Sequence, residues 1–215
     1  MSRDDPAPGE AGSAAAGEAA RRLFLAFWPE GEVREALIRV AAEVAGRWGA
    51  ERVPGADLHL TLQFLGKVAP GQERALRAAC ARLDFDGCEL ELREVAFWPS
   101  SRTLCLLAAF APDSALALVA ALAAQSAALG LVPATHAWQP HVTLARVRNR
   151  ARPQQPGVPM EEAPAPPAAW ALAAPVRWRV HGFCLAESQP GGDPALPRYG
   201  ILERWVARGA ARGAN

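Results

Sequence analysis

The chain has 215 residues, a length that fits one domain of ordinary size or two small lobes sharing a core. A hydrophobic fraction of 51% is enough for a packed interior, and the formal net charge of +1 excludes a global field that attracts nucleic acid. No apolar stretch reaches the length of a membrane span, and the first twenty residues lack the apolar region of a signal peptide. We therefore expect a cytoplasmic protein with no membrane partner.

The four cysteines give no sign of a metal centre. Cys80, Cys88, Cys105 and Cys184 show neither C-x-x-C spacing nor a nearby histidine cluster. Buried, reduced thiols are the expected outcome, with no metal and no cofactor.

The first half of the chain alternates strand and helix patterns after a tail at 1–20. That tail is rich in Ala, Gly, Pro and acidic residues without periodicity, which predicts disorder. The patterns that follow predict a strand near 22–28, a helix over 33–48, a strand ending at Gly66 and a helix over 71–83.

The second half repeats this alternation. We expect a strand over 88–97, a turn at 99–101, a strand over 103–110, a helix capped by Asp113 or Ser114, a strand over 138–147, and final strands near 177–186 and 199–206. The six prolines of residues 150–170 predict an irregular surface loop or linker, and residues 208–215 should fray. The folded domain should span 21–207.

Two copies of H-x-T-L, beginning at His59 and His141, lie in apolar runs that alternate as strands do. Strand side chains alternate between faces, so each imidazole shares a face with the hydroxyl two residues on, Thr61 or Thr143. The same rule puts Gln63 on the face of His59 and Phe64 on the apolar face. A single such motif is more often strand packing than a functional site.

The surroundings of the motifs repeat as well. The shift of 82 residues that carries His59 to His141 also carries the apolar run 21–28 onto 103–110 and the helical stretch 32–48 onto 114–130. The chain therefore has the pattern of a duplicated strand–helix–strand unit, whose two motifs can meet across a pseudo-twofold axis.

Two facing imidazoles suit general acid–base chemistry on a phosphate diester without a metal. An unperturbed pKa of about 6.5 lets either protonation state be populated near neutral pH. The threonine hydroxyls can donate to the non-bridging oxygens of the phosphate. Because the two halves look equivalent, the residues alone leave open which histidine is the acid and which is the base.

The segments His59-Leu-Thr-Leu-Gln-Phe-Leu-Gly66 and Pro140-His-Val-Thr-Leu-Ala-Arg146 resemble the signature motifs of the two-histidine phosphoesterases. Within that superfamily the chain is similar to the LigT-like RNA 2′,3′-cyclic phosphodiesterases, also called 2′-5′ RNA ligases. The similarity continues over about 21–207, and includes the opening strand at 22–28, Phe97-Trp-Pro99, and Leu185-Ala-Glu-Ser188 with Tyr199 and Trp205 after it.

The resemblance implies an α+β fold of two pseudo-symmetric lobes, each an antiparallel sheet with flanking helices, around a central cleft. It implies metal-independent hydrolysis of RNA 2′,3′-cyclic phosphate ends to 2′-phosphomonoesters. We expect the chain to act as a monomer. His59 matches the proton donor and His141 the proton acceptor, while Thr61, Thr143 and Arg146 match phosphate-binding groups.

Three other functions fit the same motifs. One is 2′-5′ ligation of RNA ends, and another is hydrolysis of a small cyclic phosphate such as ADP-ribose 1″,2″-cyclic phosphate. The third is an RNA-end-binding module without turnover.

The position of Arg146 conflicts with strand alternation. Five residues after His141, a regular strand puts it on the opposite face, beside Leu144. A bulge after Thr143, a side chain that wraps around the strand end, or an Arg that covers apolar surface would each resolve the conflict.

Other candidates have ordinary structural interpretations. Arg148, Arg150 and Arg152 fit a solvated edge or an RNA-backbone patch, and His136 and His181 fit structural roles. Core packing is the default for four aromatic residues near the motifs, with base stacking as the alternative: Phe27, Trp28, Phe64 and Trp138.

Overall fold

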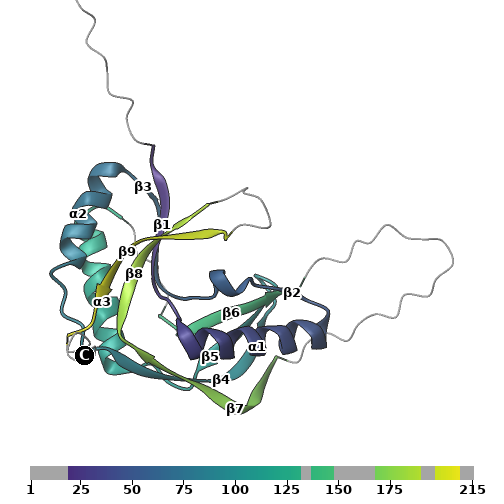
Figure 1. Ribbon diagram of the computed structural model, residues 1–215. Helices are drawn as coiled ribbons and strands as arrows, with labels where there is room; N and C mark the ends of the chain where they lie inside the picture. Colours follow the sequence, from purple (N-terminus) through teal and green to yellow (C-terminus); the bar gives the residue numbers. More distant parts are fainter. Residues whose placement is uncertain (1–18, 132–136, 148–167, 190–196, 209–215) are drawn as a thin grey trace, which may run out of the picture.

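The computed structural model describes residues 19–131, 137–147, 168–189 and 197–208, which form an α+β fold around one large antiparallel sheet (Figure 1). In chain order the elements are β1 (Arg21–Phe27), α1 (Gly31–Trp48), β2 (Glu51–Arg52), the 3₁₀ helix η1 (Gly55–Asp57), β3 (Leu60–Val68), α2 (Pro70–Cys80), β4 (Cys88–Trp98), β5 (Thr103–Ala108), α3 (Asp113–Ala128), β6 (His141–Arg146), β7 (Ala169–Val180), β8 (Gly182–Ser188) and β9 (Tyr199–Val206).

The sheet consists of two lobes that meet at the motif strands. Its strand order is β7-β4-β5-β6-β3-β1-β8-β9, with β2 added beside β6. We call β3, β1, β8 and β9 the first lobe, and β6, β5, β4 and β7 the second lobe. Leu60 pairs with Val142 where β3 meets β6, so the lobes are halves of one continuous sheet. The predicted α+β fold with antiparallel sheets is confirmed.

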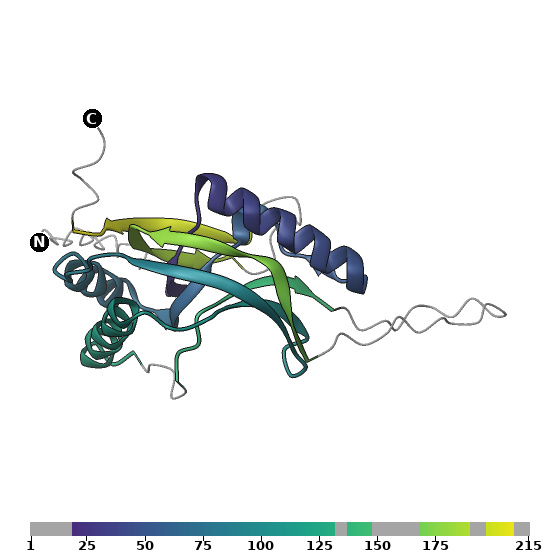
Figure 2. The same ribbon diagram turned by 90° about the horizontal axis from the view of Figure 1, so that it is seen from below.

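Helices α1 and α3 each pack on the lobe opposite to the one whose strand precedes them in the chain. Helix α1 follows β1 of the first lobe but packs on β6 and β7 of the second, whereas α3 follows β5 of the second lobe and packs on β3 and α2. Figure 2 shows α1 on the opposite side of the sheet from α2 and α3. This exchange of helices fits the pseudo-twofold duplication predicted from the sequence.

The helix ends agree only in part with the predicted signals. Gly49 ends α1 in the left-handed region at φ 54°, a conformation that glycine adopts without a steric cost. The cap predicted at Asp113 or Ser114 is wrong: the N-cap of α3 is Pro112, with no side-chain hydrogen bond. The Ser114 hydroxyl instead donates to the Gly87 carbonyl at 2.9 Å.

The strand predicted near 177–186 is two strands, β7 and β8, separated at His181. A Cβ on Gly182 would lie 2.3 Å from the Trp205 carbonyl oxygen, so the close approach of β9 requires glycine there. Strand β7 begins at Ala169, inside the predicted loop of 150–170, whereas 148–167 lie outside the described residues. The predicted tails at 1–20 and 208–215 also lie almost wholly outside them.

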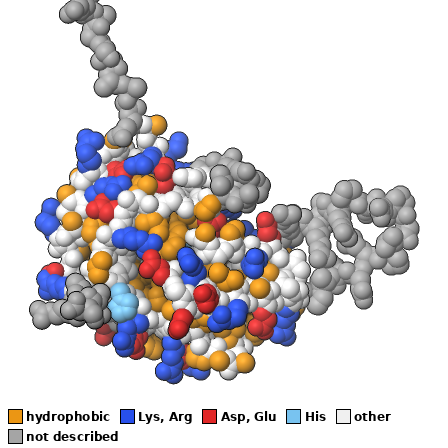
Figure 3. Space-filling model, viewed as in Figure 1, with side chains coloured by type: hydrophobic (Ala, Val, Ile, Leu, Met, Phe, Trp, Pro, Cys, Tyr) orange, Lys and Arg blue, Asp and Glu red, His pale blue; other side chains and the backbone are white. Residues whose placement is uncertain are grey.

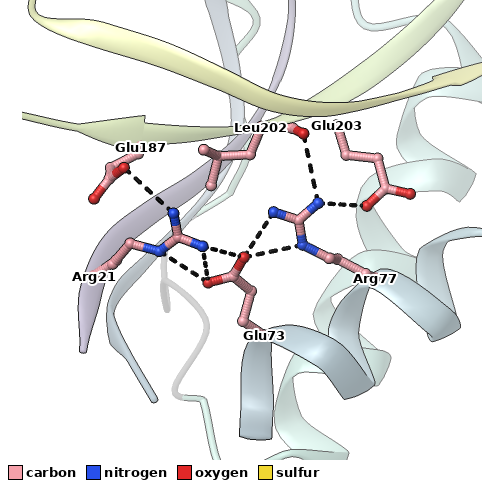
Figure 4. A network of polar contacts seen from close by, with 6 residues as sticks. All are labelled: Arg21, Glu73, Arg77, Glu187, Leu202 and Glu203. Carbon is pink, nitrogen blue, oxygen red and sulfur yellow. Dashed lines mark hydrogen bonds and ion pairs between the residues drawn. The ribbon is translucent and has the colours of Figure 1, made fainter. Parts of the chain in front are cut away.

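An ion-pair network fastens α2 to the first lobe (Figure 4). The Glu73 carboxylate accepts hydrogen bonds from Arg21 on β1 and Arg77 on α2, at distances down to 2.6 and 2.7 Å. Arg77 also pairs with Glu203 on β9, and Arg21 with Glu187 on β8. Burial alone would raise the pKa of Glu73, but the hydrogen bonds from Arg77 and Arg21 hold it below its ordinary value.

The four cysteines are free, as predicted; Cys80, Cys105 and Cys184 are buried and Cys88 is half-buried. Among the described residues, no cluster of His, Cys, Asp and Glu has a metal-binding arrangement. The helices in this part of the chain are all too short or too polar to cross a bilayer.

Candidate active site

The two H-x-T motifs meet where β3 lies beside β6. Continuing the antiparallel pair Leu60–Val142 by one residue each way puts His59 opposite Thr143, and Thr61 opposite His141. Opposed residues of an antiparallel pair share a face, so the two imidazoles and two hydroxyls lie on one side of the sheet. Leu60 and Val142, fully buried, lie on the other side.

Each imidazole is held by the same backbone contact. Nδ1 of His59 lies 2.7 Å from the Asp57 carbonyl oxygen, and Nδ1 of His141 lies 2.8 Å from that of Gln139. A carbonyl can only accept a hydrogen bond, so Nδ1 carries the proton in both rings. Nε2 of each ring is thereby left as the atom that can take up or release a proton.

Aromatic rings enclose the histidines. The His59 ring stacks on Trp28, with centroids 5.2 Å apart and planes 13° apart, and Phe24 and Tyr199 each lie 4.9 Å away. Trp98, on β4, lies 4.4 Å from His141. Three rings thus surround His59, whereas the half-buried His141 has the Trp98 ring beside it.

Burial lowers the pKa of both histidines. For His59 the positive charges of His141 and Arg146 lower the pKa further, against the opposing effects of the Asp57 carbonyl and carboxylate. For His141 the hydrogen bond to the Gln139 carbonyl raises the pKa, but burial outweighs it.

A β-bulge brings Arg146 to the face of the histidines. Leu104 pairs with Ala145 and Cys105 pairs with Thr143, so Leu144 is an extra residue in β6. Leu144 and Ala145 are consequently both buried, and Arg146 is exposed. Of the three explanations offered for the position of Arg146, the bulge after Thr143 is confirmed.

Strand β3 bulges at the matching place, and there the predicted alternation is wrong. Ala26 pairs with Thr61 and Leu25 with Gln63, which leaves Leu62 as the extra residue. Gln63 is therefore buried rather than on the face of His59. Phe64 pairs with Phe24, which touches His59, and its side chain is 65% exposed.

Several further residues support the motifs. The Asp57 carboxylate accepts the Arg198 backbone N–H at 3.0 and 3.2 Å, which ties the start of β9 to the first motif. The Trp138 indole donates to the Thr61 carbonyl at 2.9 Å, and the Cys105 sulfur lies 3.8 Å from the Thr143 hydroxyl. These contacts join segments far apart in the sequence, so no local pattern indicates them.

Of the remaining candidates, the structure describes His181 and Phe27 only, and neither is brought to the motifs. His181 is exposed between β7 and β8. Phe27 is fully buried, as core packing predicts. His136, Arg148, Arg150 and Arg152 lie outside the described residues.

Known proteins resemble this chain in sequence and in fold. Residues 27–104 match the model of the family described as LigT like Phosphoesterase. An RNA 2′,3′-cyclic phosphodiesterase of Escherichia coli is 32% identical over 131 residues, which cover 61% of this chain and 74% of that protein. One from Thermus thermophilus is 32% identical over 199 residues, covering 87% and 91%.

The fold agrees over nearly the whole length of a solved relative. The crystal structure of Escherichia coli LigT complexed with 3′-AMP superposes with a TM-score of 0.72 and 28% identity, covering 88% of this chain and 99% of that one. With its duplicated lobes, its paired motifs and relatives matched over most of their length, the chain belongs to the LigT-like phosphoesterase family.

Proposed function

We propose that the protein hydrolyses RNA 2′,3′-cyclic phosphate ends to 2′-phosphomonoesters, without a metal ion. The observation that carries the proposal is the pair of imidazoles on one sheet face, each with Nδ1 held by a carbonyl and Nε2 available for proton transfer. Two curated relatives bear the name RNA 2′,3′-cyclic phosphodiesterase, and a similar structure binds 3′-AMP, which supports a nucleotide substrate.

In the proposed reaction, His141 acts as the base and His59 as the acid. Nε2 of neutral His141 takes a proton from water as the oxygen attacks phosphorus. The bond from phosphorus to the ribose O3′ breaks, and Nε2 of protonated His59 gives its proton to that oxygen. The product carries a 2′-phosphate, and a proton returns from His141 to His59 through solvent before the next turnover.

The phosphate is held by groups from both lobes. The hydroxyls of Thr61 and Thr143 donate to its non-bridging oxygens, where negative charge develops in the transition state. Arg146, re-aimed by the bulge in β6, offers two parallel N–H groups to the same oxygens.

Phe64 occupies in the first motif the place that Arg146 occupies in the second, five residues after the histidine. Its exposed ring on the His59 face offers a surface on which the terminal base can stack. In this proposal residues 21–207 form the catalytic unit, which acts as a cytoplasmic monomer on RNA.

The test is turnover of an RNA oligonucleotide ending in a 2′,3′-cyclic phosphate, in the presence of EDTA. Phosphorus NMR should identify a 2′-phosphomonoester as the product. A 3′-phosphate would contradict the assigned leaving group, and an RNA-end-binding module would give no product. Joined RNA ends, or turnover confined to ADP-ribose 1″,2″-cyclic phosphate, would favour the ligation or small-substrate alternatives.

A further inference from the structure

A groove of about 490 Å³ lies beside the candidate active site, bordered by the start of α1 and by β7, β8 and β9. Its lining includes Trp28, Glu30, Arg177, Arg179, His181 and Arg204. Neither the motifs nor the proposed hydrolysis makes use of these basic residues. Figure 3 views the face of the molecule that carries α1, where basic, acidic and hydrophobic side chains are interspersed.

The groove is continuous with the catalytic face of the first lobe. The Trp28 indole stacks on His59 and also lines the groove. Trp28 packs in one small cluster with Phe24 and Cys184, and Arg204 pairs with Cys184 across β8 and β9. A ligand that extends away from His59 along this face therefore passes Trp28 and reaches Arg204.

The far end of the groove presents two arginines in a row. On β7 the residues Val176, Trp178 and Val180 are buried, so Arg177 and Arg179 between them face outwards. Among the lining residues that the structure describes, Glu30 is the one acid, against three arginines. Basic side chains thus outnumber acidic ones in the lining itself, although Glu89 and Glu91 beside it pair with Arg179 and Arg177.

Existing ion pairs leave these arginines able to bind another anion. Arg179 pairs with Glu89 at 2.7 Å, but the two side chains are 71% and 73% exposed. Arg177 lies 3.9 Å from Glu91, and Arg204 pairs with Glu30 at 2.9 Å. Exposed pairs of this kind contribute little to stability, so a phosphate can replace the carboxylate at little cost.

Protection of sheet edges explains only part of this pattern. Strands β7 and β9 lie at the two ends of the sheet, where charged side chains discourage pairing with other chains. That role requires neither a concave surface nor an aromatic residue shared with the catalytic histidine. A row of phosphates beside stacked bases or sugars requires both.

We infer that this groove binds the phosphate backbone of the RNA strand on the 5′ side of the cyclic phosphate. The inference rests on the proposed function and extends it from a terminal nucleotide to a strand. Because the cyclic phosphate is the 3′ end, the rest of the substrate must leave the site in one direction. It passes the Trp28 ring, and its phosphates reach Arg204, Arg177 and Arg179.

The experiment compares kcat/KM for two substrates, adenosine 2′,3′-cyclic phosphate and a single-stranded RNA oligonucleotide with the same end. The variant is Arg177→Ala/Arg179→Ala. The control is Arg74→Ala/Arg82→Ala, which removes the same charge from exposed positions on and just after α2. Thermal unfolding monitors the fold of both variants.

We expect kcat/KM for the oligonucleotide to fall about tenfold in the groove variant at low salt, since two charge-assisted contacts are lost. The mononucleotide rate, and both rates of the control, should stay unchanged. The dependence of log kcat/KM on log salt should become shallower by about 1.4, at about 0.7 for each phosphate contact on a single strand.

Equal effects on both substrates, or no effect on either, would overturn the inference while leaving the proposed function intact. A wild-type protein that turns over neither substrate would overturn the proposed function instead. In that case fluorescence anisotropy with the oligonucleotide still reports on the groove: weaker binding by the groove variant than by the control supports it, and equal binding refutes it.

Discussion

Leu60 on β3 and Val142 on β6 form the antiparallel pair at the centre of the two H-x-T motifs. About this pair each lobe places its histidine beside the threonine of the other lobe. In the proposed reaction, a phosphate bound there touches one imidazole and one hydroxyl from each lobe. The catalytic arrangement therefore depends on the register between the lobes, and the buried pair beneath it fixes that register.

The histidines should be essential, and they should act as a unit. His59→Ala and His141→Ala should each lower kcat by at least ~10², the scale of a lost general acid or base. The double variant should be far from additive, because neither proton transfer is useful alone. Steady-state kinetics on adenosine 2′,3′-cyclic phosphate with EDTA checks this. Full activity of either single variant, or a strict requirement for a divalent metal, would contradict the mechanism.

The threonine hydroxyls should stabilise the transition state rather than the fold. Thr61→Val and Thr143→Val nearly preserve the side-chain shape but remove the donor. Each should cost ~1–3 kcal/mol in kcat/KM, the penalty for a charged oxygen left without its hydrogen bond. Thermal unfolding should be little changed. Wild-type kinetics in both variants would mean that the hydroxyls serve strand packing.

Arg146 should influence the pH dependence as well as the rate. Its positive charge helps to lower the pKa of His59, so Arg146→Gln should raise that pKa. A proton donor is lost as pH rises through its pKa, and the high-pH fall of kcat/KM should therefore move to higher pH. Profiles of kcat/KM against pH for the wild type and this variant test the shift.

Arg146→Lys is the matched control because it keeps the charge and loses the planar fork. It should leave the pH profile in place while lowering kcat/KM. An Arg that merely covers apolar surface would tolerate Lys, and an unshifted profile in Arg146→Gln would show that its charge does not reach His59.

Phe64 should affect substrate binding more than stability. Base–aromatic stacking contributes ~1–3 kcal/mol, so Phe64→Ala should raise KM. The ring is 65% exposed, and its loss should change the free energy of unfolding by less than ~1 kcal/mol. Phe27→Ala, at a fully buried position, should cost ~3–5 kcal/mol and provides the comparison. Equal destabilisation by both, measured in urea, would identify Phe64 as a packing residue.

The contrast between Phe64 and its neighbours shows where sequence patterns reach their limit. Hydrophobic periodicity predicts the helices and most strands, because an element with one buried face has apolar residues at a regular spacing. It misplaced Gln63 and Phe64, and it could not choose among the three positions open to Arg146. A bulge depends on the register with the adjacent strand, which no local pattern contains.

The division of the C-terminal strands has a similar cause. Apolar residues continue on both sides of His181, with no proline between Val176 and Ala186, so the sequence predicts one strand where two occur. Just after the break, Gly182 lies against the Trp205 carbonyl, a contact between strands that are separate in the sequence and that no local pattern contains. For the same reason no local pattern places Asp57 and Tyr199 beside His59, although both complete its surroundings.

The final prediction concerns Glu73, the acceptor at the centre of the network in Figure 4. Its side chain is 8% exposed, so Glu73→Gln leaves two arginines with a poorer acceptor in a nearly dry site. Because Arg21 and Arg77 retain partial contact with water, we expect a loss of ~1–3 kcal/mol in the free energy of unfolding at neutral pH.

The effect of Glu73 should depend on pH with a definite sign. Its pKa is lower in the folded protein than its ordinary value of 4.5, so it stabilises the fold above that value and loses this contribution as pH falls through the folded pKa. The difference between wild type and Glu73→Gln should therefore shrink on acidification. Glu89→Gln, in the exposed pair with Arg179, should cost less than ~1 kcal/mol at neutral pH. Urea unfolding of the three proteins over a pH series measures the free energy of unfolding of each. If the difference between wild type and Glu73→Gln stays constant as the pH falls, the charge of Glu73 contributes nothing to the network.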